Sequence, residues 1–336
     1  MKVTDFAKNL TTFFTDYLPN VRNLSNNTIS SYRDAFRLFL MFCQEERNLK
    51  PEKLCFQMFN KKLIINFLSW LEMTRDCSIG SRNQRLVAIH SFFRYVQVQE
   101  PAYLHVCQQI LQIPCKKYQM PTISHLSVEQ TKELLMIPDS EKISGRRDIT
   151  LLSVLYDTGA RVQELCDLHV RDVHLESPAM ITLTGKGRKI RNVPIIGNTV
   201  KLLQQYMSEQ GLLKNGKQDH PLFFNQKRNK LTRGGITYIL QKHASSLKER
   251  FPNLTIKLTP HIMRHSKAMH LYQAGISLIY IRDILGHVDI STTDIYARLD
   301  IESKRRILEK AFPEITPEEL PEWNNDGNLL EFLNRL

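Results

Sequence analysis

The sequence lacks features that would place it in a membrane or outside the cell. No apolar run approaches the roughly 20 residues that a membrane-spanning helix needs. The first residues carry Asp5 and have neither the apolar stretch nor the cleavage site of a signal peptide. Six scattered cysteines without a Cys-x-x-Cys pair exclude a disulfide framework and a cysteine zinc site. We therefore expect a cytoplasmic protein with reduced thiols and no membrane partner.

Positive charge is in excess along most of the chain. The 336 residues contain 46 Lys and Arg against 34 Asp and Glu, a formal net charge of +12. Both 1–120 and 121–300 are basic, whereas 301–336 is acidic. This length exceeds what one hydrophobic core usually serves, so two domains are expected. Basic charge on both favours a nucleic acid that contacts both, with solvated surface lysines as the alternative interpretation.

The first half has the periodicity of helices. Apolar residues three or four positions apart predict four helices, which include 27–43, 63–71, 86–96 and 103–111. Four short helices in about 100 residues indicate a small bundle. A segment with prolines and lysines follows them and indicates a linker.

The second half mixes helices with a hairpin. Ser127 and Gln130 have the spacing of a capping box, and Thr158-Gly159 is a typical end of a helix over about 144–157. A short helix follows from Arg161. Strands are predicted over 180–184 and 190–195, joined by a glycine-containing hairpin. Further helices are predicted at 198–209, 235–249, 262–273, 277–285, 292–299 and 301–311. The fold class is therefore mainly α with a small β-hairpin or sheet.

Six residues of the second half form the candidate catalytic set: Arg161, Lys186, His261, Arg264, His287 and Tyr296. Taken singly, each has an ordinary structural explanation, such as a surface arginine or a packed tyrosine. Together they suit a metal-free transfer of a phosphoryl group to tyrosine. Two arginines can neutralise a phosphodiester and its pentavalent transition state. Histidine and lysine can move protons, and an assisted tyrosine hydroxyl is a usable nucleophile.

Metal and nucleotide sites are not indicated. His261 and His265 have the spacing of a zinc pair, but Ile262 stands where that motif needs glutamate. No acidic cluster suits a two-metal nuclease. Gly185-Lys186-Gly187 lacks the hydroxyl residue and the following helix of a nucleotide-binding loop. We expect no metal, no cofactor and no ATP.

Five segments resemble the tyrosine recombinases, the phage-integrase and Xer-type site-specific DNA recombinases. These segments, in the family's order, are 158–165, 184–189, 261–265, 285–287 and 291–296. The resemblance implies a helical core DNA-binding domain at 1–115, a linker at 116–125, an α+β catalytic domain at 126–312 and an acidic tail at 313–336. The two domains would form a C-shaped clamp on double-stranded DNA.

The resemblance also implies how the phosphate is held. Arg161 and Arg264 would clamp the scissile phosphate, and His287 would donate to a non-bridging oxygen. Glu164 matches an acidic position of the family and would orient the side chains of the active site.

The remaining implied roles concern bond breakage. Tyr296 would attack the phosphorus and leave a 3′-phosphotyrosine and a free 5′-hydroxyl, with His261 as the base or hydrogen-bond partner of the tyrosine proton. Lys186 would be the general acid for the 5′-oxygen. Other cations share its hairpin and leave the identity of the acid open: Arg188, Lys189 and Arg191.

DNA contacts are predicted on helices of the first half and on the hairpin. The expected phosphate-binding residues are Lys61, Lys62, Arg82, Arg85, Arg94, Arg188 and Lys189, with His90 beside the arginines. A solvated cationic helix face is the alternative.

The acidic tail is expected to bind protein. Residues 313–336 hold six acidic residues against one basic residue. The apolar stripe of Leu329, Leu330, Phe332 and Leu333 would suit a groove on another copy. The resemblance to the tyrosine recombinases implies that this copy belongs to a homotetramer on two DNA sites, reached through monomers or dimers. Docking in cis is the alternative.

The implied biological role is that of an integrase or transposase of a mobile element in a prokaryote, associated with the nucleoid when bound to DNA. Three alternatives stay open: an Xer-like resolvase of chromosome or plasmid dimers, a type IB topoisomerase, and a DNA-binding regulator without activity.

Overall fold

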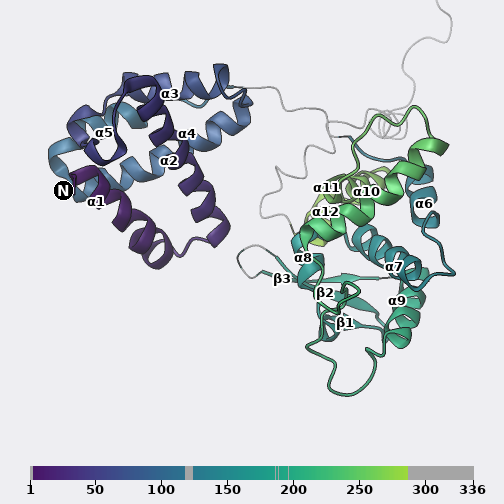
Figure 1. Ribbon diagram of the computed structural model, residues 1–336. Coiled ribbons are helices and arrows are strands. Elements are labelled where there is room, and N and C mark those ends of the chain that lie inside the picture. The colour runs from purple at the N-terminus through teal and green to yellow at the C-terminus, as the bar shows by residue number, and fades with distance from the viewer. Residues whose placement is uncertain (1–2, 118–123, 186, 188, 196, 287–336) are drawn as a thin grey trace, which may run out of the picture. The chain divides into compact units, whose positions relative to one another are not determined.

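The computed structural model describes residues 3–117, 124–185, 187, 189–195 and 197–286. The chain divides into two compact units, Met1–Pro121 and Thr122–Leu336, called here the N-terminal and C-terminal units (Figure 1). In the part that the structure describes, no helix has both the length and the apolar character to cross a bilayer.

The N-terminal unit is helical. Its main elements are α1 (Asp5–Thr12), the π-helix η1 (Phe13–Val21), α2 (Asn26–Arg47), α3 (Lys61–Met73), α4 (Ile79–Gln99) and α5 (Leu104–Leu111), with single turns η2 (Pro51–Lys53), η3 (Phe56–Met58) and η4 (Pro101–Tyr103). The four predicted helices are confirmed as α2 to α5, and α1 with η1 is an addition. The side chains of Ser25, Asn60 and Ser78 accept backbone N–H groups and begin α2, α3 and α4.

Aromatic rings fill the core of this unit. The ring of Phe92, in α4, lies 5.8 Å from that of Phe6, 5.2 Å from that of Phe13 and 5.2 Å from that of Phe36, all near edge-to-face. All four side chains are fully buried. This geometry is favourable for aromatic quadrupoles, and it places α4 at the centre of the unit with helices on several sides.

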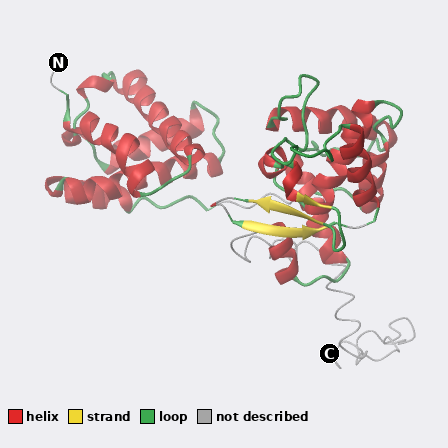
Figure 2. Cartoon of the chain, turned by 90° about the horizontal axis from the view of Figure 1, so that it is seen from below, coloured by secondary structure: helices red, strands yellow, loops and turns green. Residues whose placement is uncertain are grey.

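The C-terminal unit packs helices around a small antiparallel sheet (Figure 2). Its helices are α6 (Val128–Met136), α7 (Ile143–Thr158), α8 (Val162–Asp167), the single turn η5 (Val170–Asp172), α9 (Asn198–Glu209), α10 (Arg233–Arg250), α11 (Pro260–Gln273) and α12 (Leu278–Leu285). The strands β1 (Val173–His174), β2 (Met180–Thr184) and β3 (Ile190–Pro194) lie in the order β1-β2-β3. The predicted hairpin is confirmed as β2 and β3, with Thr184 opposite Ile190.

The end of α7 sets the position of the next elements. Thr158 is followed by Gly159 in the left-handed conformation (φ 55°), which ends the helix as predicted. A Cβ atom on Gly159 would lie 2.6 Å from Cδ2 of Leu285, so α7 ends in close contact with the end of α12. The chain then turns into α8, which Arg161 precedes directly.

Candidate active site

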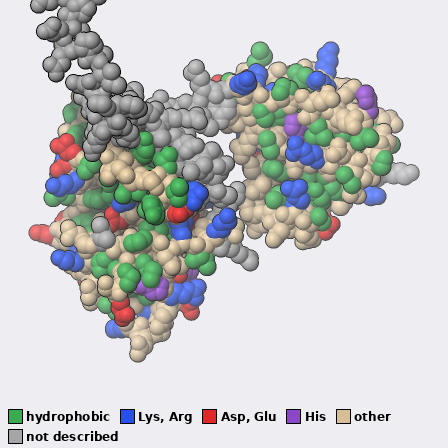
Figure 3. All heavy atoms as spheres, turned by 180° about the vertical axis from the view of Figure 1, so that it is seen from behind, with side chains coloured by type: hydrophobic (Ala, Val, Ile, Leu, Met, Phe, Trp, Pro, Cys, Tyr) green, Lys and Arg blue, Asp and Glu red, His purple; other side chains and the backbone are tan. Residues whose placement is uncertain are grey.

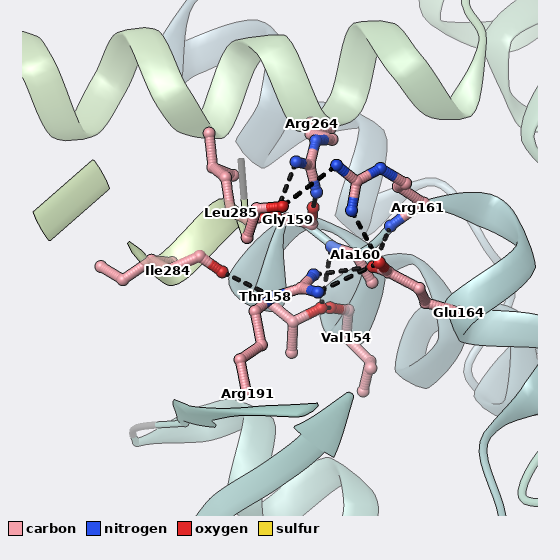
Figure 4. A network of polar contacts seen from close by, with 11 residues as sticks. Val154, Thr158, Gly159, Ala160, Arg161, Glu164, Arg191, Arg264, Ile284 and Leu285 are labelled. Atoms are coloured by element: carbon pink, nitrogen blue, oxygen red, sulfur yellow. Dashed lines mark hydrogen bonds and ion pairs between the residues drawn. The ribbon is translucent and has the colours of Figure 1, made fainter. Parts of the chain in front are cut away.

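Three arginines surround the C-terminal end of α12 (Figure 4). Arg161 precedes α8, Arg191 lies in β3 and Arg264 lies in α11. The last carbonyl groups of a helix have no partner within the helix and carry partial negative charge. Here the three guanidinium groups donate to three successive carbonyl oxygens at this end of the helix, those of Ile284, Leu285 and Gly286.

Each contact is short and specific. Arg264 donates from Nη2 to the Leu285 oxygen (2.6 Å) and from Nη1 to the Gly159 oxygen (2.6 Å), which joins the ends of α12 and α7. Arg161 donates from Nη2 to the Gly286 oxygen (3.2 Å). Since their acceptors are adjacent residues, the guanidinium groups of Arg161 and Arg264 lie side by side. The Arg161 side chain is 32% exposed, whereas Arg264 is buried.

Glu164, in the first turn of α8, joins two of these arginines. Its Oε1 accepts from Arg161 Nη1 (2.8 Å) and from Arg191 Nη1 (3.0 Å), and its Oε2 accepts from Arg191 Nη2 (2.7 Å). Oε2 also accepts the backbone N–H of Arg161 (2.8 Å), the return bond of a capping box. Burial alone raises the pKa of this carboxyl, but the bonds from Arg191 and Arg161 outweigh it and lower the pKa below its usual range.

His261 lies on the first turn of α11, three residues before Arg264. Thr259 begins this helix by accepting the Ile262 N–H (3.3 Å), and Pro260 occupies its first position. Although His261 retains an exposed surface, protein atoms crowd its ring. This desolvation and then the charges of Arg264 and Arg161 lower its pKa below 6.5. His261 is therefore neutral near pH 7 and able to accept a proton.

His265 responds to the same charges. Its ring lies 6.5 Å from that of His261, and burial, His261, Arg264 and His125 together lower its pKa to about 4. No group of three His, Cys, Asp or Glu among the described residues could hold a metal ion.

An effect of acid on stability follows from His265. The native state keeps this side chain neutral down to about pH 4, whereas the unfolded chain takes up the proton below about pH 6.5. The C-terminal unit should lose stability as the pH falls through this window. We expect His265→Gln to make the decline of Tm between pH 6.5 and 4 shallower, and His174→Gln, at an exposed histidine of β1, to leave it unchanged. Equal slopes for the two variants would contradict the assignment.

Other predicted site residues lie outside the described residues. They are Lys186, Arg188, His287 and Tyr296, and the tail with Leu329, Leu330, Phe332 and Leu333. Lys189 is described and exposed, directly before β3.

The predicted DNA-contact residues of the N-terminal unit differ in exposure. Lys61, Lys62 and Arg94 are exposed, and the face in Figure 3 shows Lys and Arg in separate patches on this unit. Arg82 is 6% exposed and pairs with Glu72 (3.4 Å from Nε).

Together with Arg82, two more residues of α4 correct the prediction that its polar side chains share one solvent-facing side. His90 is buried with Nε2 3.1 Å from the Ile110 oxygen, and Arg85 is half-buried and donates to the Ser81 oxygen (2.9 Å). Arg82 and His90 therefore do not share a solvent-facing surface with Arg94. The reason is that α4 is enclosed on most sides, so polar residues along it are drawn into internal contacts.

Family models match most of the chain. Residues 124–303 match the phage integrase family, and residues 10–101 match the N-terminal SAM-like domain of phage integrases. This chain belongs to the phage integrase family. Its activity class is accordingly site-specific DNA recombination by breakage and rejoining of DNA. A protein of Sinorhizobium fredii, named as an integrase/recombinase, is 36% identical over all 336 residues and 99% of its own length. The tyrosine recombinase XerC of Herpetosiphon aurantiacus is 34% identical over 85% of this chain and 89% of its own.

Solved structures of this family agree with the fold. The XerH recombinase in a post-cleavage complex with difH DNA has a TM-score of 0.65 at 25% identity, over 86% of this chain and 80% of that chain. The Tn1549 transposon integrase in complex with transposon right-end DNA has a TM-score of 0.69 at 16% identity, over 89% and 98% of the two chains, which concerns the fold alone.

Within this integrase-family site, Arg191 makes more contacts than its place in the sequence predicts. The sequence indicates Arg191 only as an alternative to Lys186 for the general acid, whereas the structure shows it paired with Glu164 and bonded to the end of α12. The only sequence signal was its position in the strand that follows the glycine hairpin.

Proposed function

We propose that this chain cuts and rejoins duplex DNA through a 3′-phosphotyrosine on Tyr296, in the service of a mobile element. The observation that supports the proposal is the convergence of Arg161 and Arg264. Both lie at the end of α12, with neutral His261 one turn from Arg264. Nine residues lie between Gly286 and Tyr296, so even a fully extended chain could carry the tyrosine no more than about 35 Å from the end of α12.

The chemistry is a transfer of one phosphodiester bond. The Tyr296 oxygen attacks phosphorus, the bond between phosphorus and the 5′-oxygen breaks, and the tyrosine proton passes to His261. Lys186 gives a proton to the departing 5′-oxygen. Arg161 and Arg264 neutralise the extra charge of the pentavalent transition state.

Rejoining reverses these steps with a 5′-hydroxyl from a second duplex. The phosphotyrosine conserves the bond, so the cycle needs neither ATP nor a metal ion. Double-stranded DNA is the partner, and exchange of strands between two sites requires four copies of the chain, one for each strand that is cut. Lys61, Lys62 and Arg94 would contribute salt-dependent phosphate contacts.

The role in a mobile element is supported by the Sinorhizobium relative, which is named as an integrase/recombinase and matches the chain from end to end. Similarity to XerC makes resolution of chromosome or plasmid dimers the second candidate. The two differ in their DNA: a mobile element is recombined at its own ends, whereas a resolvase acts on a chromosomal or plasmid site.

A nicked duplex tests the proposal, because loss of the short cleaved fragment traps the covalent intermediate. Duplexes carrying the ends of the encoding element form one arm of the experiment, and an Xer-type site forms the other. We expect a DNA-linked protein band on a denaturing gel with element ends and the native chain, and no band with Tyr296→Phe.

The matched control is Tyr280→Phe, which removes the hydroxyl of an exposed tyrosine in α12. It should form the adduct at the native rate. An adduct with Tyr296→Phe would refute the choice of nucleophile, and an adduct only on the Xer-type site would replace the mobile-element role by that of a resolvase.

A further inference from the structure

Arg191 is the one arginine at the end of α12 that the proposed mechanism does not use. Its side chain is 12% exposed. Nη1 and Nη2 donate to the two oxygens of Glu164 (3.0 and 2.7 Å), and Nε donates to the Ile284 oxygen (2.9 Å). All three of its nitrogens therefore bond to the protein. The Arg191 side chain is therefore held within the protein, whereas that of Arg161 is partly exposed.

Two glycines lie close to this ion pair: Gly185, directly after β2, and Gly286, directly after α12. A Cβ atom on Gly286 would lie 2.9 Å from Nη1 and 3.0 Å from Cδ of Arg191. A Cβ atom on Gly185 would lie 3.0 Å from Oε1 of Glu164 and 3.5 Å from Nη1 of Arg191. A Cβ atom at either position would lie closer to the ion pair than ordinary van der Waals contacts allow. The ion pair of Glu164 and Arg191 thus fills the space between the backbones of the two glycines.

Each of these two glycines directly precedes a candidate catalytic residue in the sequence. Gly185 directly precedes Lys186, and Gly286 directly precedes His287. The Glu164 carboxylate also holds Arg161 through Nη1. One buried pair therefore lies against the backbones of the glycines that precede two candidate catalytic residues, and its carboxylate bonds to the side chain of a third, Arg161.

We propose that Arg191 is a positioning residue for recombination, which acts through Glu164 and the last turn of α12 on the placement of Lys186 and His287. This inference rests on the proposed function, because it takes the roles of these two residues from there. Arg191 itself touches neither the phosphate nor the reacting atoms.

The planar fork of arginine explains why this residue type is needed. It presents two parallel N–H groups to a carboxylate and a third, on Nε, in another direction. Lysine carries the same charge but cannot satisfy both Glu164 oxygens and the Ile284 carbonyl with that geometry. Without the fork, the end of α12 can shift relative to β3. A shift of about 1 Å at a catalytic group costs roughly 100-fold in rate.

The test measures adduct formation on the nicked duplex at saturating protein, with DNA affinity and Tm measured in parallel. We expect Arg191→Gln to lower the rate by roughly 10- to 100-fold while the Kd for DNA changes by less than about threefold. Arg146→Gln is the matched control. Arg146 also joins a carboxylate, Glu209, to backbone carbonyls of Ser140 and Glu141, but at the far end of α7. The rate of adduct formation by Arg146→Gln should stay within about twofold of the native rate.

A second comparison separates positioning from general damage. In a chain that carries Lys186→Ala and His287→Ala, Arg191→Gln should reduce the rate by less than about threefold, since residues that act as a unit are not additive. The same factor in both backgrounds would overturn the proposal, as would a native-background effect no larger than that of Arg146→Gln. If Arg191→Gln does not fold, Arg191→Lys replaces it with the same expectations. Tyr296→Phe in the same gel reports on the proposed function separately, because an adduct there refutes the nucleophile and not the inference.

Discussion

Replacement of Arg264 by lysine should lower the rate of covalent adduct formation by about 100- to 1,000-fold, the range observed when one preorganised donor to a developing charge is lost. Lysine keeps the positive charge but offers one ammonium group in place of a planar fork. It cannot replace the bonds to the Gly159 and Leu285 oxygens, both 2.6 Å, and still face a phosphate beside Arg161. The rate is measured in a single turnover at saturating protein.

The control for this prediction is Arg250→Lys. Arg250 is exposed in α10 and pairs with Glu133, so its replacement should leave the rate within about twofold of the native value. The Kd of Arg264→Lys for DNA should rise by a far smaller factor than the rate of adduct formation falls, because most phosphate contacts lie elsewhere. A rate for Arg264→Lys within threefold of the native rate would mean that this guanidinium does not face the reacting phosphate.

Among the proposed variants, Glu164→Gln should lower the stability of the C-terminal unit the most. The carboxylate is 4% exposed and compensates two guanidinium groups, those of Arg161 and Arg191. Removal of one member of a buried ion pair leaves an uncompensated charge and costs about 3–5 kcal/mol. We expect the free energy of unfolding of the C-terminal unit to fall by about this amount, as measured by denaturant titration of the full chain.

The same carboxylate has a pH signature. The pKa of Glu164 lies below its usual range in the folded state, so its stabilisation is present above the pKa of the unfolded chain, about 4.3. It is lost as the pH falls through the lower, folded-state pKa. Glu164→Gln should therefore flatten the dependence of stability on pH below about 4.3.

A surface pair supplies the control for Glu164. Glu209 in α9 bonds to Arg146 (2.9 Å) and is 28% exposed. Glu209→Gln should cost at most about 1 kcal/mol, because solvent screens the pair. If Glu164→Gln were no more costly than Glu209→Gln, the ion pair would not hold the site together.

The sequence predicted most helices where local signals were strong. The helix at 198–209 has the bounds of α9, and the capping box of Ser127 and Gln130 forms both of its hydrogen bonds. Gly159 ends α7 because only a left-handed residue makes that turn without strain. In contrast, β1 has two residues, too few for alternation to appear, and the helical segment η1 contains Pro19, which usually breaks a helix.

The site could be predicted as a set of residues but not as an arrangement. Motif order singled out Arg161, Glu164 and Arg264, yet the contacts that bring the two arginines together are made with backbone carbonyls at the end of α12, which no residue pattern reveals. Arg191 was undervalued for the same reason, because its partners are distant in sequence. The burial of Arg82 could not be predicted either, because it depends on the helices that enclose α4 and on the internal pair with Glu72.

The identity of the DNA-linked residue tests the account most directly. The adduct formed by the native chain on a nicked duplex is digested with protease and nuclease, and the nucleotide-bearing peptide is sequenced by mass spectrometry. The account predicts one modified peptide, with the 3′-phosphate of the cleaved strand on Tyr296 and a free 5′-hydroxyl on the released fragment. A 3′-phosphate linked to any other residue, or a 5′-phosphate linkage, would contradict it.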